Sequence, residues 1–484
     1  MRLPILLLCA CALYAQPSYD LLLKGAHVID PKNKISALRD VAIRNGHIAA
    51  VEPNIPAAKA RKVVNVAGLF LTPGLIDLHA HVFAGSEGRS LAGGEASIFP
   101  DAFALRVGVT TVVDAGSSGR SNFEYFKKTV IDRARTRVLA FLNIGAAGMP
   151  GEGDEQNVDS MDAKAAAALA MANPDTIIGF KVAHYRGGDW TPVERGVEAG
   201  TIANLPVMID FGQFRPERPF QDLVLKKLRP GDIYTHCFYA PVPMLDEKGK
   251  LMPYLFEARK RGVLFDVGHG GAAFEFRQAV PAVQQGFPPD TISTDVHSGS
   301  LNSGMKDQLN VMSKFLNMGM TLDDIIYRST WNPARVIHRE QIGHLSVGAI
   351  ADIAVLRVEK GQFAFVDSFG ARMDGSQKLV NELTVASGLV VYDLNGRTRE
   401  RWEKLGKYEA LGEPWWDGTR GSSRALPLTN TPPSAQYSPL KQINRSNAAQ
   451  LAKAWQFDSG DEYKGSEMQC RPIVIDGVLY GTTP

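Results

Sequence analysis

Short apolar segments recur along the chain, and each is followed by a stretch long enough to form a helix. The segments are rich in β-branched and aromatic residues, which is typical of strands buried in a parallel sheet. Eight of them occur, at residues 75–81, 109–115, 138–144, 177–181, 206–210, 233–236, 263–269 and 292–295. Eight alternations of strand and helix predict an α/β fold, a (β/α)8 TIM barrel, rather than an open sheet.

Two of the intervening stretches carry a helix-start signal. Thr191 is followed three residues later by Glu194, and Thr321 is followed three residues later by Asp324. A threonine with an acidic residue at this spacing is typical of a helix N-cap. We therefore expect helices that have Thr191 and Thr321 as their caps.

Strand patterns also occur on both sides of the barrel, which we place at residues 73–342. Before the barrel, Asn45-Gly46 is a hairpin-turn signal that follows a short alternating segment. After the barrel, short β runs return at residues 348–356 and 388–392. We expect the two ends to pair in one small flanking β-sandwich, formed by residues 19–72 and 343–396.

The remaining C-terminal part has a different character. Residues 397–435 are polar and rich in Gly, Pro and Trp, which predicts a linker. Residues 436–484, including Ala454-Trp455 and the β-rich run at 472–480, resemble the start of quinoprotein dehydrogenases, which are propellers that bind pyrroloquinoline quinone. The likeness ends within one blade, whereas a propeller needs several. This incomplete, propeller-blade-like segment implies a truncated fusion or a vestige, and the alternative is a poorly packed tail.

The first fifteen residues predict export. Met1-Arg2 precedes an apolar stretch that is too short for a membrane span and fits a signal peptide at residues 1–15. The expected location is periplasmic or extracellular, although Leu8-Cys9-Ala10-Cys11 leaves a lipid anchor as an alternative. Without that segment only Cys237 and Cys470 remain, so no disulfide framework is expected.

The expected partner is a small-molecule substrate, and the charge balance argues against a polyanion. The chain has 53 basic and 51 acidic residues, which are interspersed and give a formal net charge of +2. No polyanion-binding face is indicated, so nucleic acid is not an expected partner. The oligomeric state does not follow from the sequence.

His79 and His81 lie two residues apart at the end of the first barrel strand. Because strand side chains alternate, both imidazoles point to the same face, where they can bind one metal ion. In these barrels the chemistry lies at the C-terminal ends of the strands. Taken alone, the pair is equally compatible with two ordinary histidines.

Three later strands end in residues that strengthen a metal centre: Lys181, His236 and Asp295. A lysine in an apolar strand is costly unless its amine is neutralised, and a carbamate formed with carbon dioxide would make Lys181 an anionic bridging ligand. The alternative is a salt bridge at the barrel mouth. Asp295 is the natural general base, which would take a proton from metal-bound water. Its alternative role is to cap the next helix.

This set of residues resembles that of the amidohydrolase superfamily, and most closely its dihydroorotase-like deacetylase branch. The supporting segments lie at residues 229–236, 265–270 and 292–297, and the likeness runs from about residue 19 to residue 396. The resemblance implies one or two divalent ions, with zinc as the expected metal. It implies that His79, His81 and Asp295 bind the first ion, that His236 binds the second, that Lys181 is carboxylated, and that His269 contacts the substrate.

Three positions carry alternatives. The family pattern has a histidine at the end of the fifth strand, where this chain has Asp210, so the second metal site depends on whether Asp210 replaces it as a ligand. His269 is compatible with a hydrogen-bonded structural histidine instead of a substrate contact. Arg186 is a candidate for binding a substrate carboxylate or carbonyl, and is otherwise an ordinary loop arginine.

The function expected from these residues is hydrolysis of an N-acyl amide or acyl ester by metal-bound hydroxide. Opening of a cyclic amide, as in dihydroorotases, is the alternative within hydrolases. A quinoprotein oxidoreductase, with the barrel as an accessory, and a metal-free binding module on an inactive barrel are the alternatives of other classes.

Overall fold

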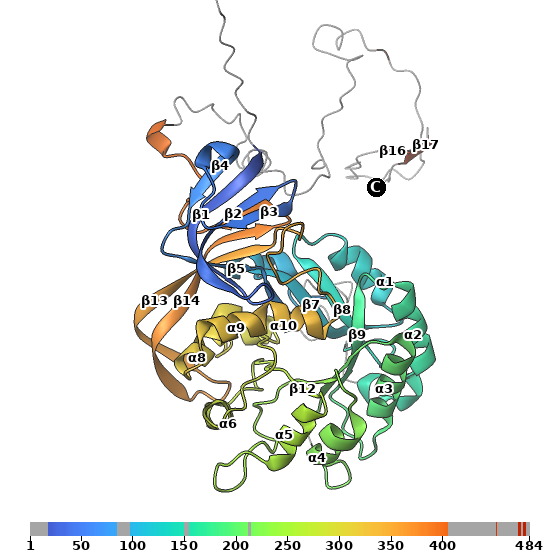
Figure 1. The fold of residues 1–484 in the computed structure, drawn as a ribbon. Coiled ribbons are helices and arrows are strands. Elements are labelled where there is room, and N and C mark those ends of the chain that lie inside the picture. Colours follow the sequence, from blue (N-terminus) through green and yellow to red (C-terminus); the bar gives the residue numbers. More distant parts are fainter. Residues whose placement is uncertain are drawn as a thin grey trace, which may run out of the picture. The chain divides into compact units, whose positions relative to one another are not determined.

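A computed structural model describes residues 18–84, 97–149, 154–211 and 214–404, residue 452, and the strands β16 (Ile473–Ile475) and β17 (Val478–Tyr480) (Figure 1). The chain divides into two compact units, residues 1–428 and 429–484. The predicted signal peptide and most of the predicted linker lie outside the described residues. In the second unit, β16 and β17 form an antiparallel hairpin.

The first unit contains a parallel sheet of seven strands, each paired with the next in chain order. Its strands correspond to seven of the eight predicted segments and are β6 (Leu75–Ala80), β7 (Val109–Gly119), β8 (Arg137–Asn143), β9 (Ile177–Ala183), β10 (Val207–Asp210), β11 (Ile233–Tyr234) and β12 (Leu264–Phe265). Most of their residues are buried, as expected for strands that are covered by helices.

Residues 291–296 connect the two edges of this sheet. The first residue of the segment forms a parallel bridge with Asp266, just after β12, and its last residue forms a parallel bridge with Ala80 of β6. The segment therefore takes the place of the eighth strand that the sequence predicts at residues 292–295. It makes isolated bridges instead of a continuous ladder.

Helices follow the strands on the outside of the parallel sheet (Figure 1). The α-helices are α1 (Phe123–Phe126), α2 (Ala163–Ala172), α3 (Thr191–Ala203), α4 (Phe220–Asp222), α5 (Pro253–Lys260), α6 (Phe276–Gln284), α7 (Ser298–Leu301), α8 (Gln308–Asn317), α9 (Leu322–Ser329) and α10 (Trp331–Val336). Short 3-10 or π-helical turns lie at η1 (Ala57–Lys59), η2 (Pro100–Ala102), η3 (Leu105–Val107), η4 (Lys127–Ile131), η5 (Asp154–Gln156), η6 (Val158–Ser160), η7 (Leu223–Lys227) and η8 (Trp402–Lys404).

The two predicted helix caps have different outcomes. Thr321 is the N-cap of α9, and its hydroxyl accepts the backbone N–H of Asp324, so this prediction is confirmed. The prediction for Thr191 is wrong, because Thr191 is the first residue of α3 and Trp190 is the N-cap, without a side-chain hydrogen bond. The proline that follows Thr191 suits the first turn of a helix, since its missing N–H has no intrahelical partner there.

Strands from both sides of the barrel segment join in one eight-stranded sheet, drawn in blue and orange in Figure 1. Strand β5 pairs with β1 on one side and with β13 on the other, which links the two ends of the first unit. The Asn45-Gly46 turn connects β2 and β3, and both residues have positive φ, as a two-residue hairpin turn requires. The strands are β1 (Tyr19–Asp30), β2 (Ile35–Arg44), β3 (His47–Glu52), β4 (Ala60–Asn65), β5 (Phe70–Pro73), β13 (Ile353–Val366), β14 (Arg372–Ala386) and β15 (Leu389–Asp393).

Apolar side chains fill the interior of the parallel sheet beneath the strand ends. Leu78, Ile178, Met208 and Ile233 belong to this buried cluster, and each lies one to three residues before a candidate metal ligand. The cluster forms a packed apolar floor, so the polar side chains at the strand ends lie in one layer above it.

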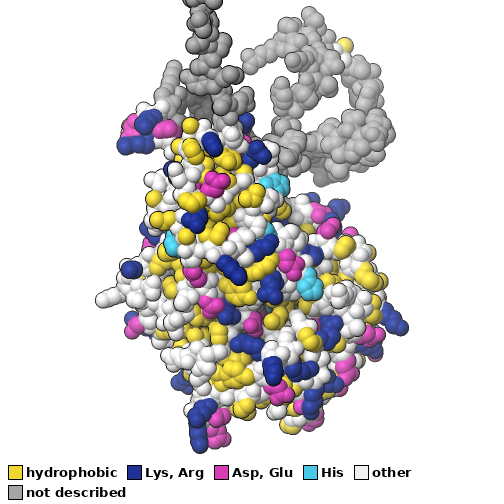
Figure 2. Space-filling view, viewed as in Figure 1, with side chains coloured by type: hydrophobic (Ala, Val, Ile, Leu, Met, Phe, Trp, Pro, Cys, Tyr) yellow, Lys and Arg dark blue, Asp and Glu magenta, His cyan; other side chains and the backbone are white. Residues whose placement is uncertain are grey.

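The outer surface is mixed in charge. On the face that Figure 2 shows, Lys and Arg side chains alternate with Asp and Glu side chains and do not gather in one patch. Among the described residues, no helix combines the length and apolar character that crossing a membrane requires.

Candidate metal centre

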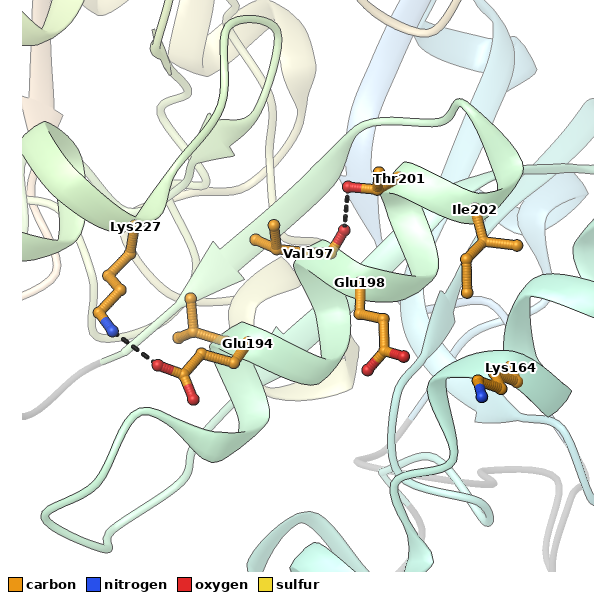
Figure 3. Close-up of a pocket in the computed structure, with 8 residues that line it drawn as sticks. Lys164, Glu194, Val197, Glu198, Thr201, Ile202 and Lys227 are labelled. Carbon is orange, nitrogen blue, oxygen red and sulfur yellow. Dashed lines mark hydrogen bonds and ion pairs between the residues drawn. The ribbon is translucent and has the colours of Figure 1, made fainter.

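A pocket on the outer side of α2 and α3 offers little chemistry (Figure 3). Its charged residues include Glu194, which pairs with Lys227 at 2.6 Å. The hydroxyl of Thr201 donates to the carbonyl of Val197, one turn earlier in the same helix. No histidine or cysteine lines this pocket. The chemically richer place is the carboxyl end of the parallel sheet.

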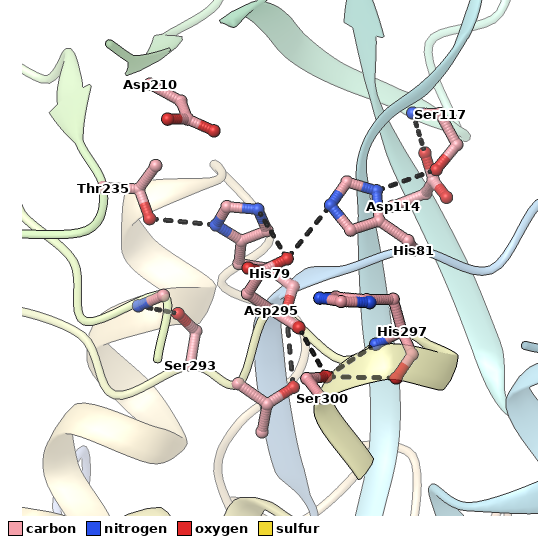
Figure 4. Close-up of polar contacts among 12 residues, drawn as sticks. His79, His81, Asp114, Ser117, Asp210, Thr235, Ser293, Asp295, His297 and Ser300 are labelled. Atoms are coloured by element: carbon pink, nitrogen blue, oxygen red, sulfur yellow. Dashed lines mark hydrogen bonds and ion pairs between the residues drawn. The ribbon is translucent and has the colours of Figure 1, made fainter. Parts of the chain in front are cut away.

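The six side chains that the sequence predicts as metal ligands come together at this end of the sheet, and all six are buried. Two compact groups of ligand atoms form there, and within each group the atoms lie within 4.8 Å of one another. Figure 4 shows part of this arrangement. The first group contains His79, His81 and Asp295, and the second contains His79, Asp210 and His236.

In the first group, Oδ1 of Asp295 faces both histidines. It lies 3.1 Å from Nε2 of His81 and 3.5 Å from Nε2 of His79. Two donor atoms at about 2.1 Å from one tetrahedral ion lie about 3.4 Å apart. The spacing of these three atoms therefore suits one metal ion.

In the second group, Oδ2 of Asp210 lies 3.1 Å from Nε2 of His236. Lys181 reaches between the two groups, because its Nζ lies 3.2 Å from Nε2 of His79 and 3.4 Å from Oδ2 of Asp210. Asp210, at the end of the fifth strand, therefore lies where its carboxylate can bind an ion together with His236. Lys181 thus lies beside His79, the residue that the two groups share.

Hydrogen bonds fix which ring nitrogen of His79 carries the proton. Nδ1 of His79 lies 2.9 Å from Oγ1 of Thr235, and the Thr235 hydroxyl donates its proton to Asp266 at 2.8 Å. The threonine oxygen can then only accept from His79. The lone pair of His79 is left on Nε2, the atom that faces the other ligands.

The other two histidines are held in the same way. Nδ1 of His236 donates to the carbonyl of Gly268 at 2.6 Å. Nδ1 of His81 lies 2.9 Å from Oγ of Ser117, whose hydroxyl is hydrogen-bonded to Asp114. In the neutral ring each Nε2 atom then carries the lone pair and faces a carboxylate oxygen. Burial lowers the pKa of His81 and His236, but Asp295 and Asp210 outweigh it and raise both pKa values, so a proton can occupy the same place. Two acceptors that face each other need a proton or a metal ion between them, and a divalent ion fits this donor set of imidazoles and carboxylates.

The electrostatics of the carboxylates favour the anionic form. Burial alone would raise the pKa of Asp295, but the electrostatic interaction with His79 and the hydrogen bond from His81 outweigh it and lower that pKa. Burial is likewise outweighed at Asp210, whose pKa is held well below its usual range by His236 and Lys181. Both carboxylates are thus ready to bind a cation.

The two candidate substrate residues lie differently. His269 is fully buried; its Nδ1 donates to the carbonyl of Gly270, and its Nε2 lies 2.6 Å from Nζ of Lys314. Arg186 is exposed in the loop after β9, and its backbone N–H donates to Gln156. Both ring nitrogens of His269 are engaged with protein groups in this arrangement.

Several functional contacts were not predicted from the sequence. Thr235, Ser117 and Asp266 orient the metal-facing histidines, and His184 lies beside Asp210, with its Nε2 3.6 Å from Oδ2. Thr235 precedes a ligand directly, so the strand-end pattern could have indicated it. His184 lies outside that pattern, because a positive φ of 54° turns it toward the site after the strand has ended.

Two family models match the chain. The model of the amidohydrolase family matches residues 274–381. The model of the glucose/ethanol/alcohol dehydrogenase β-propeller domain matches residues 428–484. The second match agrees with the resemblance of the C-terminal segment to quinoprotein dehydrogenases.

Curated relatives and solved structures cover most of the first unit. A deacetylase of Brucella anthropi is 33% identical over 69% of this chain and 83% of its own length, and a deacetylase of Agrobacterium fabrum is 34% identical over 67% and 80%. The crystal structure of an adenine deaminase has a TM-score of 0.71 and is 27% identical, covering 78% of this chain and 100% of its own. A dihydroorotase structure has a TM-score of 0.67 and is 29% identical over 77% and 99%.

Proposed function

The chain belongs to the amidohydrolase family, and from this premise we propose that it is a metal-dependent deacylase that hydrolyses N-acyl amides or acyl esters. The observation that carries the proposal is the pair of ligand groups that share His79 at the strand ends. Their histidines present Nε2 lone pairs toward Asp210 and Asp295, an arrangement that divalent ions stabilise. Zinc is the proposed metal.

A divalent ion held in these groups would lower the pKa of a water molecule and polarise the substrate carbonyl. Asp295 is the proposed general base. Its carboxylate is anionic, nearly buried and aimed at the site, so it can take a proton from the attacking water. The same carboxyl can then give the proton to the leaving nitrogen or oxygen.

Lys181 is proposed to be carboxylated. Its side chain is fully buried. Its Nζ lies close to His79, which belongs to both ligand groups, and to Asp210, which belongs to the second. A carbamate on Nζ would place anionic oxygens between two ions and remove the buried ammonium. The negative charge of the carbamate would offset the positive charge of the ions. A side chain without a positive charge would also be less costly to bury at this position.

Deacylation is the preferred reaction because two relatives named deacetylase match over most of their length. Opening of a cyclic amide is the second candidate, favoured by the dihydroorotase structure that superposes on this chain. Arg186 is proposed as a substrate contact in both reactions. The hydrogen bonds of both His269 ring nitrogens favour its alternative role as a structural histidine.

The proposal is tested by incubating the metal-replete protein with N-acyl amino acids, acyl esters and cyclic amides, with Asp295→Asn as the matched variant. We expect hydrolysis of at least one N-acyl substrate or ester, with a loss of at least about 100-fold in kcat for the variant. Hydrolysis of cyclic amides alone would select the second candidate. An unchanged rate in Asp295→Asn would contradict the proton-transfer role.

A further inference from the structure

Three non-glycine residues at the strand ends share an unusual backbone conformation. His184, His236 and Asp295 have φ angles of 54°, 57° and 51°. Side chains other than glycine rarely adopt this region, and such strain is concentrated at functional sites. His236 and Asp295 are candidate metal ligands, and His184 shares their conformation just after β9, although turn residues such as Lys34 and Ser387 adopt it as well.

A buried carboxylate orients the ring of His184. Oε2 of Glu155 lies 2.8 Å from Nδ1 of His184, and the Glu155 side chain is only 2% exposed. Oε1 of Glu155 accepts a hydrogen bond from Asn143 at 2.8 Å, which holds the carboxylate in place. A carboxylate accepts only, so Nδ1 of His184 must donate and the lone pair lies on Nε2.

That lone pair faces the second ligand group. Nε2 of His184 lies 3.6 Å from Oδ2 of Asp210, close to the separation of about 3.4 Å expected for two donors on one tetrahedral ion. Metal-ligating histidines usually donate their other ring N–H to a carboxylate or a carbonyl, as Nδ1 of His184 does to Glu155. His184 is outside the compact groups, so its half-exposed ring has to move toward Asp210 to join the second one.

We propose that His184 is a ligand of the second metal ion, supported by Glu155, and that it supplies the imidazole that the fifth strand lacks because Asp210 stands there. The inference rests on the proposed metal-dependent function. It adds His184 to the second ligand group of His79, Asp210 and His236, and assigns Glu155 a positioning role. The loop after β9 thus contributes His184 to the metal centre, and the strand itself contributes Lys181.

The test measures bound zinc and its affinity in the full chain, purified with bicarbonate and titrated against a chelator. We compare the wild type, His184→Ala, Glu155→Gln and His27→Ala, a control at a hydrogen-bonded histidine on β1. We expect two ions in the wild type and in the control. His184→Ala should keep the first ion and bind the second at least about tenfold more weakly, and Glu155→Gln should show a smaller loss.

The outcomes separate this inference from the proposed function. If His184→Ala and Glu155→Gln both retain two ions at wild-type affinity, the proposed role of His184 is overturned, whatever the catalytic rates of the two variants. A wild type with one ion also overturns it, while the first site and the function stand. A wild type that binds no divalent ion overturns the proposed function itself. Glu155→Gln is nearly isosteric, so it keeps the test decisive if His184→Ala fails to fold.

Discussion

Nδ1 of His79 lies 2.9 Å from Oγ1 of Thr235, and this bond leaves the metal-facing nitrogen of His79 unprotonated. Because His79 belongs to both ligand groups, Thr235→Val should weaken both metal sites. We expect a loss of about 10- to 100-fold in zinc affinity, measured by competition with a chelator. Thr235→Ser keeps the hydroxyl and should retain the affinity. Equal affinities in the two variants would show that the hydrogen bond does not tune the site.

Gly116 makes room for Lys181. A Cβ at this position would lie 2.6 Å from Cγ and 2.7 Å from Cβ of Lys181, and Gly116 has a φ of 92°. Gly116→Ala should therefore displace Lys181, lower the bound metal below the wild-type number and reduce activity. Gly370→Ala is the matched control, since its φ is 83° and its Cβ would meet no atom within 4 Å.

Both glycine variants carry the backbone strain, which costs about 1–2 kcal/mol of stability. Only Gly116→Ala carries the clash with Lys181. Metal content and kcat should therefore separate the two variants, while chemical unfolding should show a loss of stability in both. A Gly116→Ala protein with wild-type metal content and activity would refute the packing argument.

Asp210 ends the fifth barrel strand, where the sequence resemblance leads us to expect a histidine. If it is a ligand, the protein purified with bicarbonate should carry close to two divalent ions, and Asp210→Ala should lower that number. Elemental analysis of the dialysed proteins measures it. A stoichiometry of one in both forms would show that Asp210 holds no ion.

Lys314 is a buried lysine of α8. Its Nζ contacts His269 and donates to the carbonyls of Gly304 and Val366, and burial lowers its pKa to about 7. Its pKa in the unfolded chain is near 10.5, so the unfolded state binds more protons between these values. Stability should therefore rise with pH in this window, by at most about 1.4 kcal/mol per pH unit from this group.

Lys314→Met removes the titrating amine and also leaves its three acceptors without a donor. The variant should be less stable than the wild type at every pH, and its free energy of unfolding should lack this rise between pH 7 and 10. Urea unfolding of the metal-replete proteins at several pH values measures the difference. A parallel pH dependence in both proteins would contradict the lowered pKa of Lys314.

The candidate ligands at the strand ends could be predicted because two regularities of sequence meet there. The first is the alternation of side chains along a strand, which places His79 and His81 on one face. The second is that the ends of parallel strands lie in one layer, which brings Asp210 and Asp295 close to the two histidines. The first regularity is local in the sequence, and the second follows from the fold class. The ligand groups therefore did not depend on details of packing.

The missed features depend on contacts between distant segments or on special backbone angles. His184 reaches Asp210 through a positive φ, and Glu155 meets it from a separate turn. The long strand β14 was not predicted, because its first half is largely exposed and polar where the β13–β14 hairpin extends. Thr191 satisfied a capping pattern, but Trp190 took the cap position.

The most direct test of the metal-dependent function follows zinc and hydrolysis together. The protein is stripped of metal with a chelator, reloaded with zinc in the presence of bicarbonate, and assayed with the N-acyl or ester substrate that the panel identifies. We expect no hydrolysis in the stripped protein and activity that returns in proportion to the zinc bound. Full activity in protein shown by elemental analysis to be free of metal would contradict the metal centre of His79, His81 and Asp295.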